Sequence, residues 1–273
     1  MAFETLTYSV DGGKVRIGIN RPKAVNAING TMKRELRDAF IQAGKEPNAR
    51  VIIFYGEGPN FSSGVDLKDM ATNGWEHTPA GWGGHFDECI AGCRAMWDND
   101  LPIICVVKGY ALGGGLDYVL AADYVLAADN ARLGCPEIMM GAFAPTLMLP
   151  WVVNMKKARE VLAMGIEMSA QEAMAMGMVN RVFPLDQLDA EVEKWADQIC
   201  NIPKAAATMA KKSINYQYEV MGLWEGIQHN REMSVTLNLV KTVEERAEAL
   251  RFIREEGLKA LLNKLAANTL VRY

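Results

Sequence analysis

The amino-acid sequence predicts a mixed α/β core followed by a region made of helices. Short apolar runs typical of buried strands alternate with helical patterns, and helical patterns dominate after residue 145. The alternation ends near residue 200, so we divide the chain into a core over residues 1–200 and a C-terminal helical region over residues 201–273. A length of 273 residues suits one large domain, or one domain with an appendage.

The chain opens with a predicted hairpin. Leu6–Val10 and Val15–Asn20 read as strands, and Gly12 and Gly13 in the short loop between them favour a tight reversal. Residues 31–46 carry apolar positions at helical spacing, and Val51–Tyr55 is an apolar run of the kind found in strands buried on both faces.

The middle of the chain continues the alternation. Residues 56–84 are rich in Gly, Ser, Asn and Pro and are expected to form a long loop. Later elements follow from apolar periodicity and from glycine and proline breaks. They are a helix over Phe86–Trp97, a strand over Leu101–Val107, a loop over Gly109–Gly115, a helix from Gly114 to about Ala122, a strand over Tyr124–Ala127 and a loop from Cys135.

Helices dominate the last part of the chain. The helical patterns cover residues 155–165, 169–176, 187–201, 203–220, 222–240 and 243–265, with a short strand over Met178–Val182. The last helices are apolar around much of their circumference, so they need a partner surface from the core or from another subunit. We favour another subunit and expect an oligomer.

Composition excludes several classes of protein. Half of the residues are apolar and the formal net charge is −4, which excludes disorder as the main state and disfavours a nucleic-acid partner. No apolar run reaches about 18 residues, so we expect no membrane span. The start of the chain has no basic segment followed by an apolar one, so it does not resemble a signal peptide.

The cysteines indicate a reducing compartment. They are odd in number and form no C-x-x-C pair, which predicts neither a disulfide framework nor a metal site. Cys89 and Cys93 lie four residues apart in a helical stretch, and this spacing is more typical of packed thiols than of a metal pair. We therefore expect a cytoplasmic protein.

Two glycine-containing segments are candidates for chemistry, Asn60–Leu67 and Gly109–Asp117. Each follows a buried strand, and glycine lets the backbone approach a ligand closely. The second segment begins a helix, whose first N–H groups have no acceptor within the helix and favour an anion or a developing oxyanion. The alternative interpretation is a tight turn at a helix start. The dinucleotide-binding and P-loop patterns are both missing from the sequence.

Several motifs together are specific, and the sequence resembles the crotonase (enoyl-CoA hydratase/isomerase) superfamily. The matching segments occur in family order over about residues 5–200. They are Ile19–Ala27, Phe61–Leu67, Gly109–Gly115, Cys135–Ile138, and Ser169–Ala173 leading to Ala175–Asn180. The resemblance implies a crotonase-like spiral of ββα units with a C-terminal helical trimerisation region. It further implies an acyl-CoA substrate and a homotrimer or a dimer of trimers.

The resemblance also implies an active site. The backbone N–H groups of Ser63 and Gly114 match the pair that holds the thioester oxygen. Asp117 and Glu137 match the two carboxylates of the hydratases, although Asp117 is one methylene shorter than the usual glutamate. Read alone, Asp117 would be a favourable charge at a helix N-terminus and Glu137 a turn carboxylate.

The acyl group is less constrained by the sequence. An Asp at position 117 is also similar to the dienoyl-CoA isomerases of the family, but their further acid corresponds here to Pro145. Trp82, Phe86, Phe143 and Pro145 are candidates for the acyl pocket. Aromatic residues there are consistent with a cyclic or aromatic acyl group, and the alternative is ordinary packing.

The resemblance places coenzyme A near two segments. The matching candidates are Lys23, Ala24, Val25, Asp66, Leu67 and Lys68. A polyanion bound to an acidic chain needs local cations, and Arg21, Lys23 and Lys68 can supply them. Phe252 matches the start of a C-terminal phosphate-binding segment, but Arg254-Glu255-Glu256-Gly257 follows it in place of lysines.

From these observations we predict a hydro-lyase that adds or removes water syn across the α,β double bond of an enoyl-CoA. No cofactor and no metal are expected, because coenzyme A is part of the substrate. The alternatives are a double-bond isomerase, a hydrolase or C–C lyase acting on a 3-oxoacyl-CoA, and a non-catalytic binding protein on the same fold.

Overall fold

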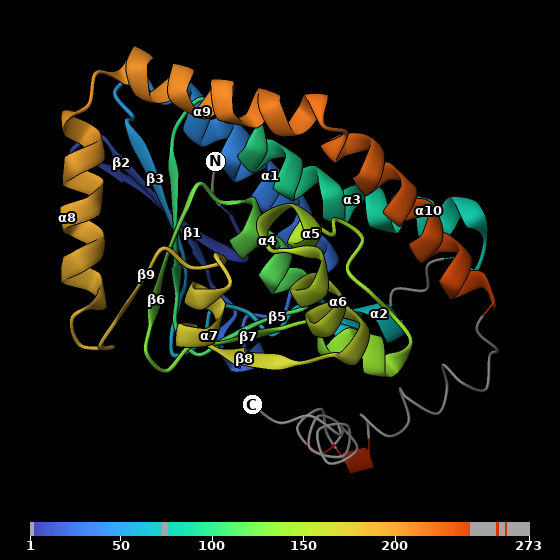
Figure 1. The fold of residues 1–273 in the computed structure, drawn as a ribbon. Helices are drawn as coiled ribbons and strands as arrows, with labels where there is room; N and C mark the ends of the chain where they lie inside the picture. The colour runs from blue at the N-terminus through green and yellow to red at the C-terminus, as the bar shows by residue number, and fades with distance from the viewer. Residues whose placement is uncertain (1–2, 73–75, 241–254, 257–259, 261–273) are drawn as a thin grey trace.

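The computed structural model describes residues 3–72, 76–240, 255–256 and 260, and within them the strands form two sheets (Figure 1). The larger sheet has the order β1-β2-β3-β4-β6-β9 and the smaller one the order β5-β7-β8. The strands of the larger sheet are β1 (Leu6–Asp11), β2 (Lys14–Ile19), β3 (Val51–Gly56), β4 (Ile103–Val107), β6 (Tyr124–Ala128) and β9 (Arg181–Phe183). Those of the smaller sheet are β5 (Tyr110–Leu112), β7 (Arg132–Gly134) and β8 (Glu167–Ser169).

The predicted hairpin is confirmed. β1 and β2 pair antiparallel, with Leu6 opposite Ile19 and Asp11 opposite Lys14. Gly12 and Gly13 make the turn at φ values of 55° and 83°, which glycine adopts without a Cβ clash.

From β2 onward the larger sheet is parallel, and this explains the apolar runs in its strands. Each central strand is covered on both faces, so neighbouring residues alternate between two cores. In β3, Ile52 and Phe54 face the main core, whereas Val51 and Ile53 face a second core under α8 (Leu188–Asn201). Figure 1 shows α8 alone on one side of the sheet and the other helices on the opposite side.

The helices follow the predicted order with some changes. They are α1 (Gly30–Lys45), α2 (Leu67–Thr72), α3 (Pro79–Trp97), α4 (Gly114–Ala121), α5 (Leu149–Val152), α6 (Met155–Met164), α7 (Ala170–Ala175), α8, α9 (Lys204–Val220) and α10 (Leu223–Val240), with 3₁₀ turns η1 (Pro22–Ala24) and η2 (Pro136–Met140). α9 and α10 run along one side of the molecule, and α10 packs on α3 (Figure 1).

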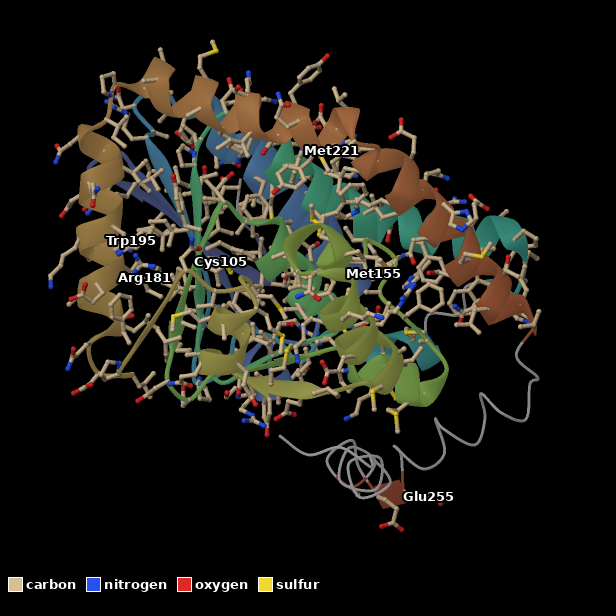
Figure 2. All side chains as sticks on the ribbon, in the orientation of Figure 1. Cys105, Met155, Arg181, Trp195, Met221 and Glu255 are labelled. Carbon is tan, nitrogen blue, oxygen red and sulfur yellow. The ribbon has the colours of Figure 1, made fainter. Side chains whose placement is uncertain are left out.

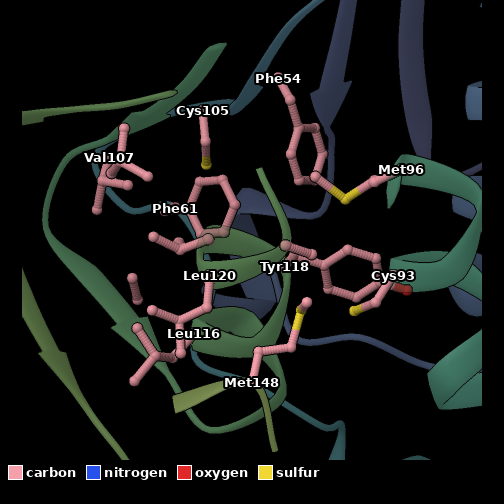
Figure 3. Packing of buried hydrophobic residues seen from close by; sticks show 14 of the residues in the cluster. Phe54, Phe61, Cys93, Met96, Cys105, Val107, Leu116, Tyr118, Leu120 and Met148 are labelled. Carbon is pink, nitrogen blue, oxygen red and sulfur yellow. The ribbon is translucent and has the colours of Figure 1, made fainter. Parts of the chain in front are cut away.

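Aromatic side chains fill the main core between the sheet and α1, α3 and α4. The ring of Phe54 meets Phe40, Phe61 and Tyr118 edge-on at centroid distances of 5.1, 5.3 and 6.1 Å. Edge-to-face contacts are the favoured geometry for such rings. Figure 3 shows Cys93 beside Tyr118 in this core.

The second core is smaller and lies under α8. The apolar face of α8, made of Leu188, Val192, Ala196 and Ile199, covers the sheet. Trp195 of the same helix, labelled in Figure 2, packs edge-on against Tyr124.

The long loop predicted over residues 56–84 is wrong in part. α2 lies inside it, and α3 begins at Pro79 instead of Phe86. The Thr78 hydroxyl accepts a hydrogen bond from the Gly81 amide and Pro79 occupies the first turn, so the helix has an ordinary start. The first two turns of α3 contain three glycines, Gly81, Gly83 and Gly84. Glycine has low helix propensity and adds no apolar side chain, so the sequence pattern did not indicate a helix there.

Two further details differ from the sequence prediction. The strand expected over Met178–Val182 starts later, at Arg181, and the three-residue strands of the smaller sheet were not predicted. Strands this short leave almost no periodic signal. Apart from residues 255–256 and 260, the helix expected over residues 243–265 lies outside the described residues, as does Phe252. The division near residue 200 stays a prediction. No helix among the described residues is long and apolar enough to cross a membrane.

Candidate active site

The start of α4 is the centre of the candidate site. Gly113 precedes the helix with φ 52° and donates its amide to the Gly134 carbonyl at 2.9 Å. Gly114 is the first helical residue, so its N–H has no acceptor within the helix. Asp117 lies in the first turn, and its side chain is buried. The sequence therefore places an amide donor and a carboxyl group at one helix start.

Glu137 reaches the same place from the other side. It lies in the first turn of η2, and a Cβ built on Gly113 would lie 3.0 Å from its Oε2 and 3.3 Å from its Cδ. A Cβ at position 113 would therefore crowd the carboxylate, which would have to shift by a few tenths of an ångström. Both Glu137 carboxylate oxygens are buried and have no hydrogen-bond partner among the described residues. Buried polar groups are nearly always paired, so such an orphan carboxylate marks a functional position.

The two carboxyl groups influence each other electrostatically. Burial raises the pKa of Asp117 well above its usual value, the Glu137 carboxylate raises it further, and Thr146 opposes both effects. Burial raises the pKa of Glu137 to about 7. A neutral form of one carboxyl beside an ionisable form of the other is the arrangement that general acid–base catalysis uses near neutral pH.

The second glycine segment lies directly beside the first. Ser62 pairs with Ala111 in a parallel bridge, which adds the loop to the edge of β5. Gly64 has φ 90°, and a Cβ there would lie 2.7 Å from the Leu112 carbonyl oxygen and 3.4 Å from the Gly114 amide nitrogen. The predicted proximity of the two segments is therefore present in the fold.

The Ser63 amide is engaged within the protein. It donates to the Val25 carbonyl oxygen at 3.0 Å. Val25 and Asn26 both have φ 53°, a left-handed conformation that is uncommon for residues other than glycine, and strain of this kind gathers at functional segments. A ligand oxygen at Ser63 must share this amide with Val25 or displace it.

The candidate coenzyme A residues lie on two neighbouring segments. Lys23 and Ala24 belong to η1, and Val25 ends it, while Leu67 and Lys68 begin α2. An Ile28–Val65 bridge joins the two segments. Lys23 and Lys68 are exposed, which is what a phosphate-binding role requires.

Asp66 and Arg21 form part of this architecture. The Arg21 guanidinium pairs with the Asp66 carboxylate at 2.8 Å. Asp66 also accepts the amides of Lys68 and Asp69 at 3.0 and 3.2 Å and so caps α2. Burial raises the pKa of Asp66, but Arg21 and these amides outweigh it and lower the pKa below its usual value. The Arg21 guanidinium is thus engaged by Asp66, and Lys23 and Lys68 are the exposed candidate cations on these segments.

The four candidate acyl-pocket residues divide into two pairs. Trp82 and Phe86 of α3 stack at a centroid distance of 5.8 Å and pack with Val235 and Leu239 of α10. Phe143 and Pro145 lie in the segment after η2, where Phe143 is half-buried and Pro145 is buried. No contact between the two pairs is recorded in the described structure, although both lie near α10.

Sequence reasoning missed a polar group behind the carboxyl pair. Lys33 is 1% exposed and its Nζ lies 3.1 Å from His85 Nδ1. Burial and, to a smaller extent, the Lys33 charge lower the pKa of His85 to about 3. Cys89 and Cys93 carry free thiols whose pKa values are raised by burial, in agreement with packed thiols. A lysine within the apolar stripe of α1 was the signal that could have revealed this group.

The described residues contain no group of three or more His, Cys, Asp or Glu side chains arranged to hold a metal ion.

Comparison with known proteins places the chain in a family. The family model for enoyl-CoA hydratase/isomerase matches residues 11–266. A "Probable enoyl-CoA hydratase" of Mycobacterium bovis is 33% identical over 240 residues, covering 85% of this chain and 89% of that protein. A carnitinyl-CoA dehydratase of Citrobacter koseri is 35% identical over 238 residues, covering 84% and 86%.

The solved structures agree. The crystal structure of an enoyl-CoA hydratase/isomerase from Xanthobacter autotrophicus Py2 superposes with a TM-score of 0.92 at 28% identity, covering 99% of this chain and all of that one. The chain therefore belongs to the enoyl-CoA hydratase/isomerase family of the crotonase superfamily. It has the crotonase fold with a C-terminal helical region, and it is an enzyme of the hydratase type.

Proposed function

We propose that this enzyme adds or removes water syn across the α,β double bond of an enoyl-CoA thioester. The observation that carries the proposal is the Glu137 carboxylate, which is buried without a partner against Gly113, one residue from the Gly114 amide and beside buried Asp117. Two carboxyl groups and an amide at a helix start meet the needs of water addition next to a carbonyl group.

In the proposed reaction the thioester oxygen binds between the N–H groups of Gly114 and Ser63. These donors stabilise the enolate that forms when water attacks the β-carbon, and one such donor typically contributes about 3–4 kcal/mol to the transition state. Asp117 and Glu137 together hold the water, accept its proton and deliver a proton to the α-carbon. Because the pair is coupled, its pKa values belong to the pair as a whole. Ser63 exchanges the Val25 carbonyl for the thioester oxygen.

For the substrate we propose an acyl-CoA with a cyclic or aromatic acyl group. The support is compositional: Phe143 and Pro145 lie in the segment that leads to Thr146, which lies near Asp117, and Trp82 and Phe86 lie on α3. The Lys23 and Lys68 side chains are the proposed phosphate contacts. Coenzyme A enters as part of the substrate, and no separate cofactor is proposed.

We also propose that the enzyme assembles as a homotrimer or a dimer of trimers and acts in the cytoplasm. Exposed apolar side chains on α9 support assembly, and five free cysteines support a reducing compartment.

The reaction is tested with purified protein and a panel of straight-chain, dienoyl and ring-unsaturated acyl-CoAs in ordinary and heavy-oxygen water. We expect product mass to rise by one water that carries the label. Bond migration without water gain would identify an isomerase, and a free acid or ring-opened product would identify a hydrolase or C–C lyase.

The site assignment is tested on the best substrate of that panel. We expect Asp117→Asn and Glu137→Gln each to lower kcat by about 10²–10⁴-fold, the usual contribution of a general acid or base. Unchanged turnover in both variants would overturn the roles given to the two carboxyl groups even if hydration itself were observed.

A further inference from the structure

Asn230 links α10 to the chain segment beside Asp117. Its side-chain amide donates to the carbonyl oxygens of Ala144 and Pro145, each at 2.7 Å. The residue is 8% exposed, so both hydrogen bonds are shielded from water. A primary amide has two N–H donors and no charge, whereas a carboxylate has no donor and a hydroxyl has one.

The tethered segment leads directly to the candidate site. Thr146 follows Pro145, is 1% exposed and lies near Asp117, although its Oγ1 is buried without a hydrogen-bond partner among the described residues. Leu147 then adopts φ 36°, a positive value that is strained for a side chain of this size. Such a conformation persists only where the surroundings fix it, and Leu147 lies between the Pro145 carbonyl that Asn230 holds and the buried Met148 side chain.

α10 is itself fixed to the core. Arg231, the next residue, forms a two-point ion pair with Asp87 of α3, with Nε–Oδ1 and Nη2–Oδ2 distances of 2.8 and 2.7 Å. Paired nitrogen–oxygen contacts of this kind set orientation as well as attraction. α3 and α10 lie side by side along their lengths (Figure 1). Asn230 is therefore held in place by the packing of α10 on α3, the helix that also carries the candidate pocket residues Trp82 and Phe86.

We propose that Asn230 is a positioning residue of the active site, which holds residues 144–147 so that Thr146 and the adjoining wall keep Asp117 in its reactive geometry. The catalytic part of this inference rests on the proposed function, whereas the tether itself does not. The Asn230 side chain bonds to the carbonyls of Ala144 and Pro145 and not to the two carboxyl groups. In this proposal the C-terminal helical region therefore contributes to the active site indirectly, through the segment that Asn230 holds.

The test compares Asn230→Ala and Asn230→Asp with Gln228→Ala. Gln228 lies on the same helix, is exposed, and bonds only to Glu232 at 3.1 Å. For the Asn230 variants we expect kcat to fall by about 10²-fold, as for a misplacement of about 1 Å, with KM changed less than about threefold. Gln228→Ala should keep both parameters. Thermal unfolding of each variant shows whether the protein is folded at the temperature of the kinetic assay.

Hydrogen–deuterium exchange gives a readout that does not depend on the reaction. We expect amides within residues 142–148 to exchange faster in Asn230→Ala than in the wild type and in Gln228→Ala. Wild-type kcat and KM in folded Asn230 variants would overturn the positioning role, and unchanged exchange would overturn the tether. The two proposals can fail separately. If the wild type turned over no acyl-CoA, and Asn230→Ala still exchanged faster than the wild type over residues 142–148, the proposed function would be refuted and the tether supported.

Discussion

At the scale of single residues, Gly113 shapes the candidate site through its backbone conformation and its missing side chain. Its positive φ turns the backbone into α4, and its missing Cβ admits the Glu137 carboxylate at 3.0 Å from where that atom would lie. The same residue therefore sets the direction of the Gly114 amide and the place of the acid.

Gly113→Ala should accordingly damage activity and stability together. We expect about 1–3 kcal/mol of destabilisation from the strained backbone and a fall in kcat of about 10²-fold from the displaced carboxylate. Gly84→Ala is the matched control, since Gly84 is an exposed residue in α3 with open space around its Cα. That variant should be stabilised by about 0.5–1 kcal/mol. Urea unfolding measures the free energy of unfolding of each variant, and steady-state kinetics measures its kcat. Equal changes in the two variants would contradict the role given to Gly113.

Glu137 should also impose a pH dependence on stability. Its pKa rises from 4.5 in the unfolded chain to about 7 in the folded protein, so the folded state binds more protons between these values. The free energy of unfolding therefore falls as pH rises from about 4.5 through 7, by about 3 kcal/mol for this group.

Glu137→Gln should remove this part of the pH dependence. Urea unfolding at pH 5 and pH 8 will show a smaller loss of stability in the variant than in the wild type. Glu225→Gln, at an exposed carboxyl, should follow the wild type. Parallel behaviour of Glu137→Gln and the wild type would mean that the Glu137 carboxyl is not desolvated in the folded protein.

The sequence predicted that the candidate carboxyl groups Asp117 and Glu137 lie together, but it did not predict the polar residues around them. Asp117 and Glu137 stand in motifs whose spacing in the chain is itself informative. Thr146, Lys33 and Asn230 act from segments distant in sequence, and their positions depend on how helices pack, which a single sequence does not encode locally. For Lys33 and Asn230 the only signal was a polar residue within an apolar helical face, and Thr146 lies outside any helix.

At the scale of elements, strong periodicity predicted most helices well, and local chemistry decided the exceptions. The start of α3 was missed because three glycines outweighed the Thr78–Pro79 cap. α9 was predicted to within one residue, yet nothing in its sequence indicated how it is anchored. Lys211 provides the anchor: it is 4% exposed, pairs with Asp123 at 2.8 Å and donates to the Met96 and Leu101 carbonyls.

Lys211→Met should therefore destabilise the protein strongly. Removing one partner of a buried ion pair typically costs about 3–5 kcal/mol, because the other charge stays buried and unpaired. Lys212→Met tests the neighbouring pair with Asp100, whose side chains are 53% and 52% exposed, and should cost about 1 kcal/mol or less. Denaturant unfolding at pH 7 compares them. Adding Asp123→Asn to Lys211→Met should recover part of the loss, and equal losses in the two single variants would refute the anchor.

At the scale of the whole molecule, the order of strands and helices was readable because both faces of the central strands are buried. The resulting apolar runs, separated by amphipathic helices, leave few topologies other than a layered parallel sheet. The same pattern could not show what covers α9. Its outer surface carries Met209, Tyr216 and Val220, which are 63%, 61% and 68% exposed and recur at helical spacing. Met221 continues the apolar surface at the junction with α10 (Figure 2).

The proposed trimer gives this surface a testable role. In sedimentation at micromolar concentration we expect the wild type to have a mass of about 90 kDa, three times 30.1 kDa, or twice that for a dimer of trimers. Tyr216→Glu combined with Val220→Lys should shift the mass toward 30.1 kDa, since charges at an apolar interface must be desolvated when it forms. Ala190→Glu, at an exposed position on α8, should leave the mass unchanged. Were the double variant to keep the wild-type mass while folded, the α9 stripe would lie outside the interface, and a monomeric wild type would refute the assembly itself.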